Sequence, residues 1–167
     1  MSHKRTGAVG ALLDIYENEV ESLITVIGGI SEHFLKRVLD PTTDDPNCRS
    51  IQSILTHVVH AGFGYAVSIR KIKSPAEQRP EPENHPTISA YILSLHRMFT
   101  YTEDTLQLFT DNELRITENK DKIMTGWHQQ YDPEQLMEHA IVHIMRHQRQ
   151  IENLICNAQP FNQENHS

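Results

Sequence analysis

Residues 132–151 read DPEQLMEHAIVHIMRHQRQI and form the most informative helix pattern of the chain. Asp132 is a good helix N-cap, Pro133 suits the first turn, and Glu134 is an acid where the helix dipole favours one. Apolar residues then recur at helical spacing in a stripe centred near Ala140. The sequence therefore predicts an amphipathic helix that begins at about Asp132.

Three further segments show the same apolar spacing, and none alternates in the manner of a strand. They are residues 7–28, with a short continuation after a Gly-Gly break, residues 51–72 and residues 86–111. Residues 112–131 fit a short helix, a hairpin or a loop. Four amphipathic helices indicate an all-α fold, specifically an antiparallel-type four-helix bundle.

The size and charge of the chain narrow its class. Its 167 residues suit a single domain, which we expect over residues 1–160, followed by a disordered polar tail over residues 161–167. The net charge is −7 and no block of Lys and Arg is present, which argues against nucleic-acid binding. No apolar run approaches the roughly 18 residues of a membrane span. The N-terminus does not resemble a signal peptide, so we expect a cytoplasmic protein.

The two cysteines indicate neither a disulfide framework nor a cysteine metal site. Cys48 and Cys156 lie far apart in the sequence and form no CxxC pair. A cysteine-based site is therefore not expected, and each cysteine reads as an ordinary small side chain.

Three histidines in the last helix are four residues apart, at positions 139, 143 and 147. Spacing of four residues places two imidazoles one turn apart, which suits the capture of one metal ion. Residues eight apart are separated by about 12 Å along the helix axis, which is too far for all three to bind the same ion. His143 and His147 lie toward the apolar stripe, whereas His139 is turned toward solvent. We therefore expect the pair His143 and His147 to bind.

A third ligand must come from another helix, and the segment 51–72 offers two candidates. His57 lies on the flank of its apolar stripe, whereas His60 points nearly the opposite way. The predicted site is His57, His143 and His147, which leaves a fourth position open to water or substrate, as in catalytic zinc sites. The alternative is that these histidines are simply hydrogen-bonded or exposed.

Other side chains have weaker claims to the site. Gln150, one turn after His147, could be a partner of the ligands, although a side chain that faces solvent is the favoured interpretation. Tyr91 and Phe99 could line a substrate pocket or pack in the core. No carboxylate is assigned as a general base. The remaining histidines, among them His96 on a predicted helix, are expected to have ordinary roles.

A di-iron site of the hemerythrin or ferritin type does not fit this sequence. Such sites use inward carboxylates in a Glu-x-x-His pattern on paired helices. Here Glu138 directly precedes His139, and no predicted helix contains Glu-x-x-His.

With these residues, the chain resembles the DinB-like (DinB/YfiT) superfamily of small metal-binding four-helix bundles. The resemblance lies in the phrases SIQSILTHVVHA (residues 50–61) and HAIVHIMRH (residues 139–147), in Gln150-Ile151 after the second phrase, and in their spacing. It covers about residues 7–158. Family proteins take one ligand from the second helix and two, as HxxxH, from the last, which match His57, His143 and His147. An Arg-Gly pair often follows the last histidine in the family, and here Gln148-Arg149 stands in its place.

The resemblance implies more than the residues do alone. It implies DinB-like bundle connectivity, a homodimer, and one divalent ion per chain of the Zn, Ni, Fe or Mn type. It also implies a metal-dependent enzyme that acts on a small molecule, either a hydrolase or a transferase that uses a low-molecular-weight thiol. The alternative is a non-catalytic, metal-binding dimeric interaction or stress protein that retains the bundle.

Overall fold

The computed structural model describes residues 4–158 of the chain. These residues are mostly helical, with little strand. The α-helices are α1 (Gly7–Ile27), α2 (Glu32–Lys36), α3 (Ile51–Arg70), α4 (Ile88–Leu106) and α5 (Pro133–Ala158). The connections contain the 3-10 helices η1 (Pro46–Cys48), η2 (Asp111–Glu113) and η3 (Asn119–Asp121) and the strands β1 (Ile123–Met124) and β2 (Gln130–Tyr131). The predicted tail, residues 161–167, lies outside the described residues.

Three long helices start at polar residues that cap them. The side chain of Ser50 accepts a hydrogen bond from Ser53 N at the start of α3, and Thr87 accepts one from Ala90 N at the start of α4. Asp132 does the same for α5, where its Oδ1 is 2.9 Å from Gln135 N. Each cap satisfies a backbone N–H that has no partner within its own helix.

Two helices end earlier than the sequence predicts. The predicted segments extend to residues 72 and 111, but α3 ends at Arg70 and α4 at Leu106. Beyond these residues, backbone hydrogen bonds join residues that are three apart in the sequence rather than four. Examples are Lys73 N to Arg70 O and Phe109 N to Leu106 O. Such bonds satisfy the last carbonyls of a helix but tighten its final turn, so the α-helical geometry stops.

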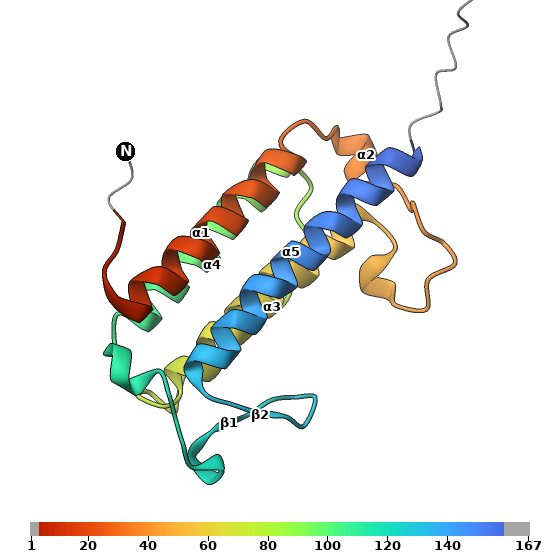
Figure 1. Cartoon of the computed structure of the whole chain (residues 1–167). Coiled ribbons are helices and arrows are strands. Elements are labelled where there is room, and N and C mark those ends of the chain that lie inside the picture. The colour runs from red at the N-terminus through yellow and green to blue at the C-terminus, as the bar shows by residue number, and fades with distance from the viewer. Residues whose placement is uncertain (1–3, 159–167) are drawn as a thin grey trace, which may run out of the picture.

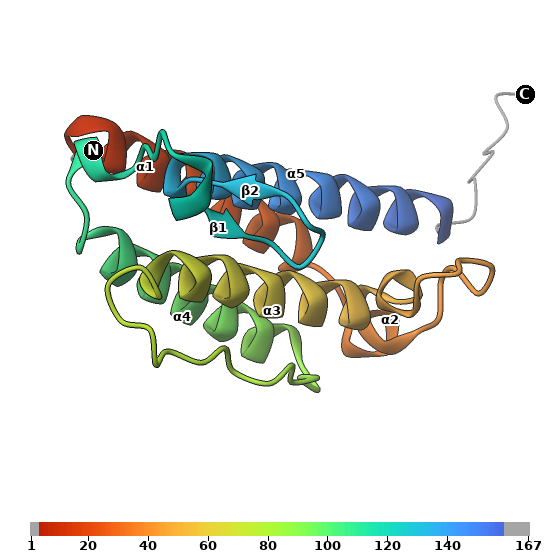
Figure 2. The same ribbon diagram turned by 90° about the horizontal axis from the view of Figure 1, so that it is seen from below.

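The four long helices pack side by side around one core. α1 contacts α4 and α5, and α3 contacts the same two helices (Figure 1). The colours in Figure 2 show that α1 and α5 run in one direction, while α3 and α4 run in the other. Neighbouring helices are therefore antiparallel in two contacts and parallel in the other two, unlike the antiparallel-type arrangement that we expected.

The parallel pair α3 and α4 depends on the long connection between them. Residues 71–87 run back along the length of the helices before α4 begins (Figure 2). An extended segment of this length can reach roughly 50 Å, whereas a helix of 20 residues is about 30 Å long. A short turn would instead have made α4 antiparallel to α3.

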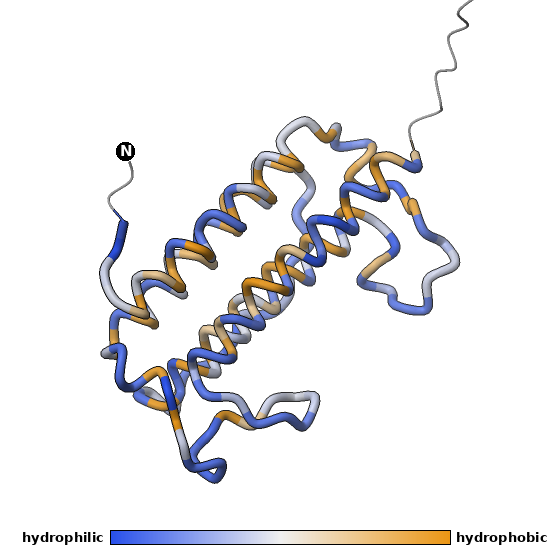
Figure 3. Tube along the Cα trace, viewed as in Figure 1, coloured by the Kyte–Doolittle hydropathy of each residue, from blue (hydrophilic) through white to orange (hydrophobic). Residues whose placement is uncertain are grey.

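The core is made of the apolar stripes of these helices, and Figure 3 shows apolar and polar residues alternating around each of them. Its largest fully buried side chains include Tyr16, Tyr91, Leu13, Leu23, Ile27, Leu35, Ile51, Ile54, Leu55, Ile69, Leu95 and Met98. Each buried aliphatic side chain contributes about 1.5–3 kcal/mol to folding. No helix within residues 4–158 is long and apolar enough to cross a membrane.

The segment 112–131, for which the sequence left three alternatives, contains a small hairpin. β1 and β2 are antiparallel, with Ile123 opposite Tyr131 and Met124 opposite Gln130. The hairpin leads directly into α5 and lies beside the helices in Figure 1. It thus brings residues 123–131 close to the start of α5.

We expect Gly62→Ala to destabilise the fold. A Cβ at position 62 of α3 would collide with the side chain of Met98 and would lie 3.0 Å from Tyr16 Oη. Overpacking of this kind costs about 1–3 kcal/mol, which exceeds the gain of roughly 1 kcal/mol in helix propensity. Urea denaturation should show a lower free energy of unfolding. Gly29→Ala is the control, because nothing lies within 4 Å of its Cβ position. A Gly62→Ala protein as stable as the wild type would contradict this close packing.

Candidate metal centre

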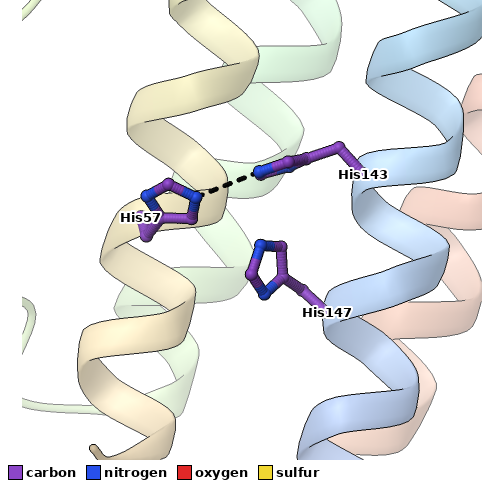
Figure 4. A group of neighbouring side chains, drawn as sticks. All are labelled: His57, His143 and His147. Atoms are coloured by element: carbon purple, nitrogen blue, oxygen red, sulfur yellow. Dashed lines mark hydrogen bonds between the residues drawn. The ribbon is translucent and has the colours of Figure 1, made fainter. Parts of the chain in front are cut away.

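The three histidines predicted from the sequence lie together between α3 and α5. His57 projects from α3, and His143 and His147 project toward it from successive turns of α5 (Figure 4). One ring nitrogen from each lies within 4.8 Å of the other two. The Nε2 atoms of His57 and His143 are 3.0 Å apart. Such a group can hold a metal ion.

The donor atoms fit a divalent ion of the zinc type. Two nitrogens bound at 2.0–2.1 Å to one tetrahedral ion are about 3.4 Å apart, close to the separation of the His57 and His143 atoms. Neutral imidazole nitrogens are common ligands of such ions.

Gln150 orients one of the three rings. Its Oε1 lies 2.9 Å from His147 Nδ1. An amide oxygen only accepts hydrogen bonds, so His147 Nδ1 carries the proton and Nε2 keeps its lone pair. Metal-binding histidines are commonly oriented in this way by a partner of their second nitrogen. Of the two roles considered for Gln150, partner of a ligand or side chain that faces solvent, the structure shows this contact with His147.

Burial keeps the three histidines neutral. Removal from solvent, together with the neighbouring His147 and His57, lowers the pKa of His143 to about 3. Burial also lowers the pKa of His57 and the pKa of His147 below the usual value. All three side chains therefore offer lone pairs at neutral pH, which metal binding requires.

Asp45 is a residue of this region that the sequence analysis missed. It accepts hydrogen bonds from Asn47 N, at 2.9 Å, and from Cys48 Sγ, at 3.4 Å, and the bond from Asn47 N is the main reason why the pKa of Asp45 is lowered. Its negative charge raises the pKa of His57 and the pKa of His147, against the larger effect of burial. Its position before Pro46, as a cap of η1, was the available signal.

Cys48 lies beside the same region, although the sequence indicated only an ordinary cysteine. Its thiol donates a hydrogen bond to the Asp45 carboxylate, with Sγ 3.4 Å from the carboxylate oxygen. Burial raises the pKa of the Cys48 thiol, which therefore stays protonated at neutral pH.

The other helix histidines do not join the site. His139 is half-buried rather than turned to solvent, because its ring stacks on Trp127 at a centroid distance of 4.8 Å. His60 Nδ1 lies 3.1 Å from Pro80 O, and the exposed His96 faces Glu21.

Tyr91 and Phe99 lie in the core. Tyr91 is fully buried, and its hydroxyl donates to Gln52 O and lies 2.6 Å from Thr56 Oγ1. Phe99 packs near Tyr16 with a centroid distance of 6.2 Å. The sequence allowed Tyr91 and Phe99 either to line a substrate pocket or to pack in the core. In the structure they pack in the core.

A cavity of about 320 Å³ opens beside the three histidines. It shares His57 with them and extends along α3 toward Arg79 and the β1–β2 hairpin. A small molecule in this cavity would therefore have access to the edge of the histidine group.

No protein-family model matches the sequence, and no curated protein matches it significantly. Functional inference for this chain therefore rests on the geometry of its own residues. The observations that carry it are the three neutral histidines and the cavity that shares His57 with them.

The lowered pKa values predict how the metal-free protein responds to acid. The folded state keeps His143 neutral, whereas the unfolded chain takes up a proton near pH 6.5. Stability is therefore retained above about pH 6.5 and is lost as the pH falls toward 3, by at most about 1.4 kcal/mol per pH unit for one proton. Urea denaturation with a chelator at pH 7, 6 and 5 measures this slope.

A matched pair of variants isolates the contribution of His143 to that slope. His143→Gln should reduce the loss of stability between pH 7 and 5, whereas His96→Gln, at an exposed position, should leave it unchanged. Equal slopes for wild type and His143→Gln would contradict the lowered pKa.

Proposed function

We propose that this protein is a metal-dependent enzyme of the DinB-like superfamily, with one divalent ion held by His57, His143 and His147. The observation that carries the proposal is the convergence of three neutral imidazoles from two helices beside a cavity of about 320 Å³. Three nitrogen ligands leave a fourth position open, which is typical of catalytic rather than structural sites. The ion is of the Zn, Ni, Fe or Mn type.

We propose that the helices are connected as in the DinB-like superfamily. This connectivity is supported by the contacts of α1 and α3 with the same two neighbours and by the parallel pair α3 and α4. The order of the ligands along the chain, one on α3 and two on α5, also agrees with the resemblance.

The chemistry we propose is hydrolysis, or transfer to a low-molecular-weight thiol, of a small-molecule substrate. When bound, a divalent ion supplies Lewis acidity and lowers the pKa of a water or thiol ligand. Gln150 holds the proton on His147 Nδ1 and thereby orients that ring. Cys48 is not one of the converging residues and hydrogen-bonds to Asp45, so a transferase would use an external thiol.

A non-catalytic metal-binding protein is the second candidate function. It is favoured by one observation: among residues 4–158, no carboxylate hydrogen-bonds to any of the three histidines. Metal that raises the melting temperature without turnover on a panel of esters and thiol acceptors would support this candidate. Turnover that requires the bound ion would support the enzyme.

A homodimer is part of the same proposal. α1 and α5 contact each other, and they carry the exposed apolar side chains Ile15, Val142 and Met145. Exposed apolar side chains of this kind are suited to an interface between copies of the chain. Light scattering of the purified protein tests the mass, and a monomer at micromolar concentration would reject the dimer.

We expect purified protein to contain close to one divalent ion per chain. His57→Ala, His143→Ala and His147→Ala should each lose most of it, because removing one of three ligands leaves too few donors for tight binding. Elemental analysis, with protein concentration from amino-acid analysis, provides the measurement.

Two other histidine variants serve as controls for the metal content. His139→Ala and His60→Ala should retain the ion, since the first side chain stacks on Trp127 and the second is near Pro80 O. Full occupancy in both His57→Ala and His143→Ala would show that the ion is bound elsewhere.

A further inference from the structure

The cavity beside His57 has one wall that consists largely of small side chains. Ala61, Gly64 and Ser68 follow His57 along one face of α3 and line the cavity. Residues 124–127 of the hairpin also line it. The cavity therefore extends from His57 along a shallow helix face.

The absence of a side chain at Gly64 leaves space for the Arg79 side chain. If residue 64 had a Cβ, that atom would be 2.6 Å from Arg79 Nη1 and 3.5 Å from Arg79 Cζ. The guanidinium group therefore lies directly against α3, in the space that any other side chain would occupy. Because Arg79 belongs to the extended connection before α4, this contact brings a cation into the wall of the cavity.

Arg79 is exposed and forms no ion pair with a carboxylate among residues 4–158. Other arginines share this property, namely Arg37, Arg49, Arg97, Arg146 and Arg149, but of these six only Arg79 lines the cavity. The charge of Arg79 contributes, after burial, to the lowered pKa of His57 and the lowered pKa of His60. An unpaired guanidinium group in a cavity wall favours an anionic ligand.

Aromatic and apolar surfaces complete the cavity. Tyr65 and Trp127 both line it, with their rings in edge-to-face orientation at a centroid distance of 6.4 Å. Met124 and Leu136 add further apolar surface. These side chains suit the apolar or aromatic body of a ligand, rather than a chain of polar groups.

We propose that this cavity binds a small carboxylate with an apolar or aromatic body, whose carboxylate pairs with Arg79 and whose opposite end lies beside His57. The placement of that end rests on the proposed metal site. Arg79 offers two parallel N–H donors, which match the two oxygens of a carboxylate, and its single charge balances that of a carboxylate. Gly64 and His57 are seven residues apart on α3, so the ligand spans about 10 Å.

The binding test uses Trp127, the only tryptophan of the chain, as its reporter. 4-Phenylbutyrate is titrated into the metal-loaded protein, and 4-phenylbutyramide, which is neutral and nearly the same shape, is titrated in parallel. We expect the carboxylate to change the fluorescence of Trp127 and to bind at least about tenfold more tightly than the amide. Equal affinities would overturn the proposal.

Two pairs of variants test the role of Arg79. Arg79→Gln removes the charge, and Gly64→Ala displaces the guanidinium group while retaining it, so each should reduce the preference for the carboxylate about tenfold. Arg97→Gln, which lines a different cavity, and Gly29→Ala, which lies outside the cavity and whose Cβ would meet nothing within 4 Å, should keep that preference. Circular dichroism verifies that each variant is folded. An unchanged preference in Arg79→Gln would overturn the proposal.

The same experiment separates this inference from the metal proposal. If elemental analysis finds no ion but the preference for the carboxylate still requires Arg79, the metal site fails and the assignment of Arg79 stands. If the ion is present but carboxylate and amide bind equally, the metal site stands and the assignment fails. Phenyl phosphate serves as a third ligand. If the protein binds it about tenfold more tightly than 4-phenylbutyrate, the proposal that the ligand is a carboxylate is overturned.

Discussion

The contact between α3 and α5 positions the three histidines, and the proposed metal site depends on it. His57 lies between turns of α3 that bury Ile54 and Val58, and His143 and His147 flank the buried Ile144 of α5. Burial of these aliphatic side chains stabilises the contact by about 1.5–3 kcal/mol each. The imidazoles are thus carried by two rigid helices rather than by loops, which suits a site whose ligand atoms must be held closely in place.

The electrostatics of the region keep the three imidazoles unprotonated at neutral pH. Burial makes each imidazole a weaker base, and the charge of Arg146 lowers the pKa of each of the three histidines further. Asp45 opposes this effect only in part. A divalent ion at the three histidines would add positive charge next to a cavity that already contains Arg79. In our proposals the ligand carboxylate pairs with Arg79, about 10 Å from His57 along α3, so it balances the charge of Arg79 and not that of the ion.

The connections of the fold decide what surrounds the histidines. The long segment 71–87 brings Arg79 against Gly64, the hairpin brings Trp127 to the other side of the cavity, and the loop before α3 brings Asp45 and Cys48 to the opposite flank. Apart from Gly64, which lies on α3, none of these residues belongs to the helices that carry the histidines. The helices therefore hold the candidate ligands, while the loops provide the groups that would select and orient a substrate, a division that is common in proteins with rigid scaffolds.

The sequence by itself determined the four long helices, the Asp132 cap of the last one and the choice of His143 and His147 over His139, because helical periodicity and capping are local and can be read within a few turns. The convergence of His57 with that pair agrees with the sequence prediction because both lie at the edges of buried stripes. Only the tertiary structure decided the mixed parallel and antiparallel packing, the half-buried environment of His139, and the positions of Asp45, Cys48 and Arg79. These features depend on contacts between residues far apart in the chain, which no local pattern records, since a loop residue shows no periodicity that points toward its eventual neighbours.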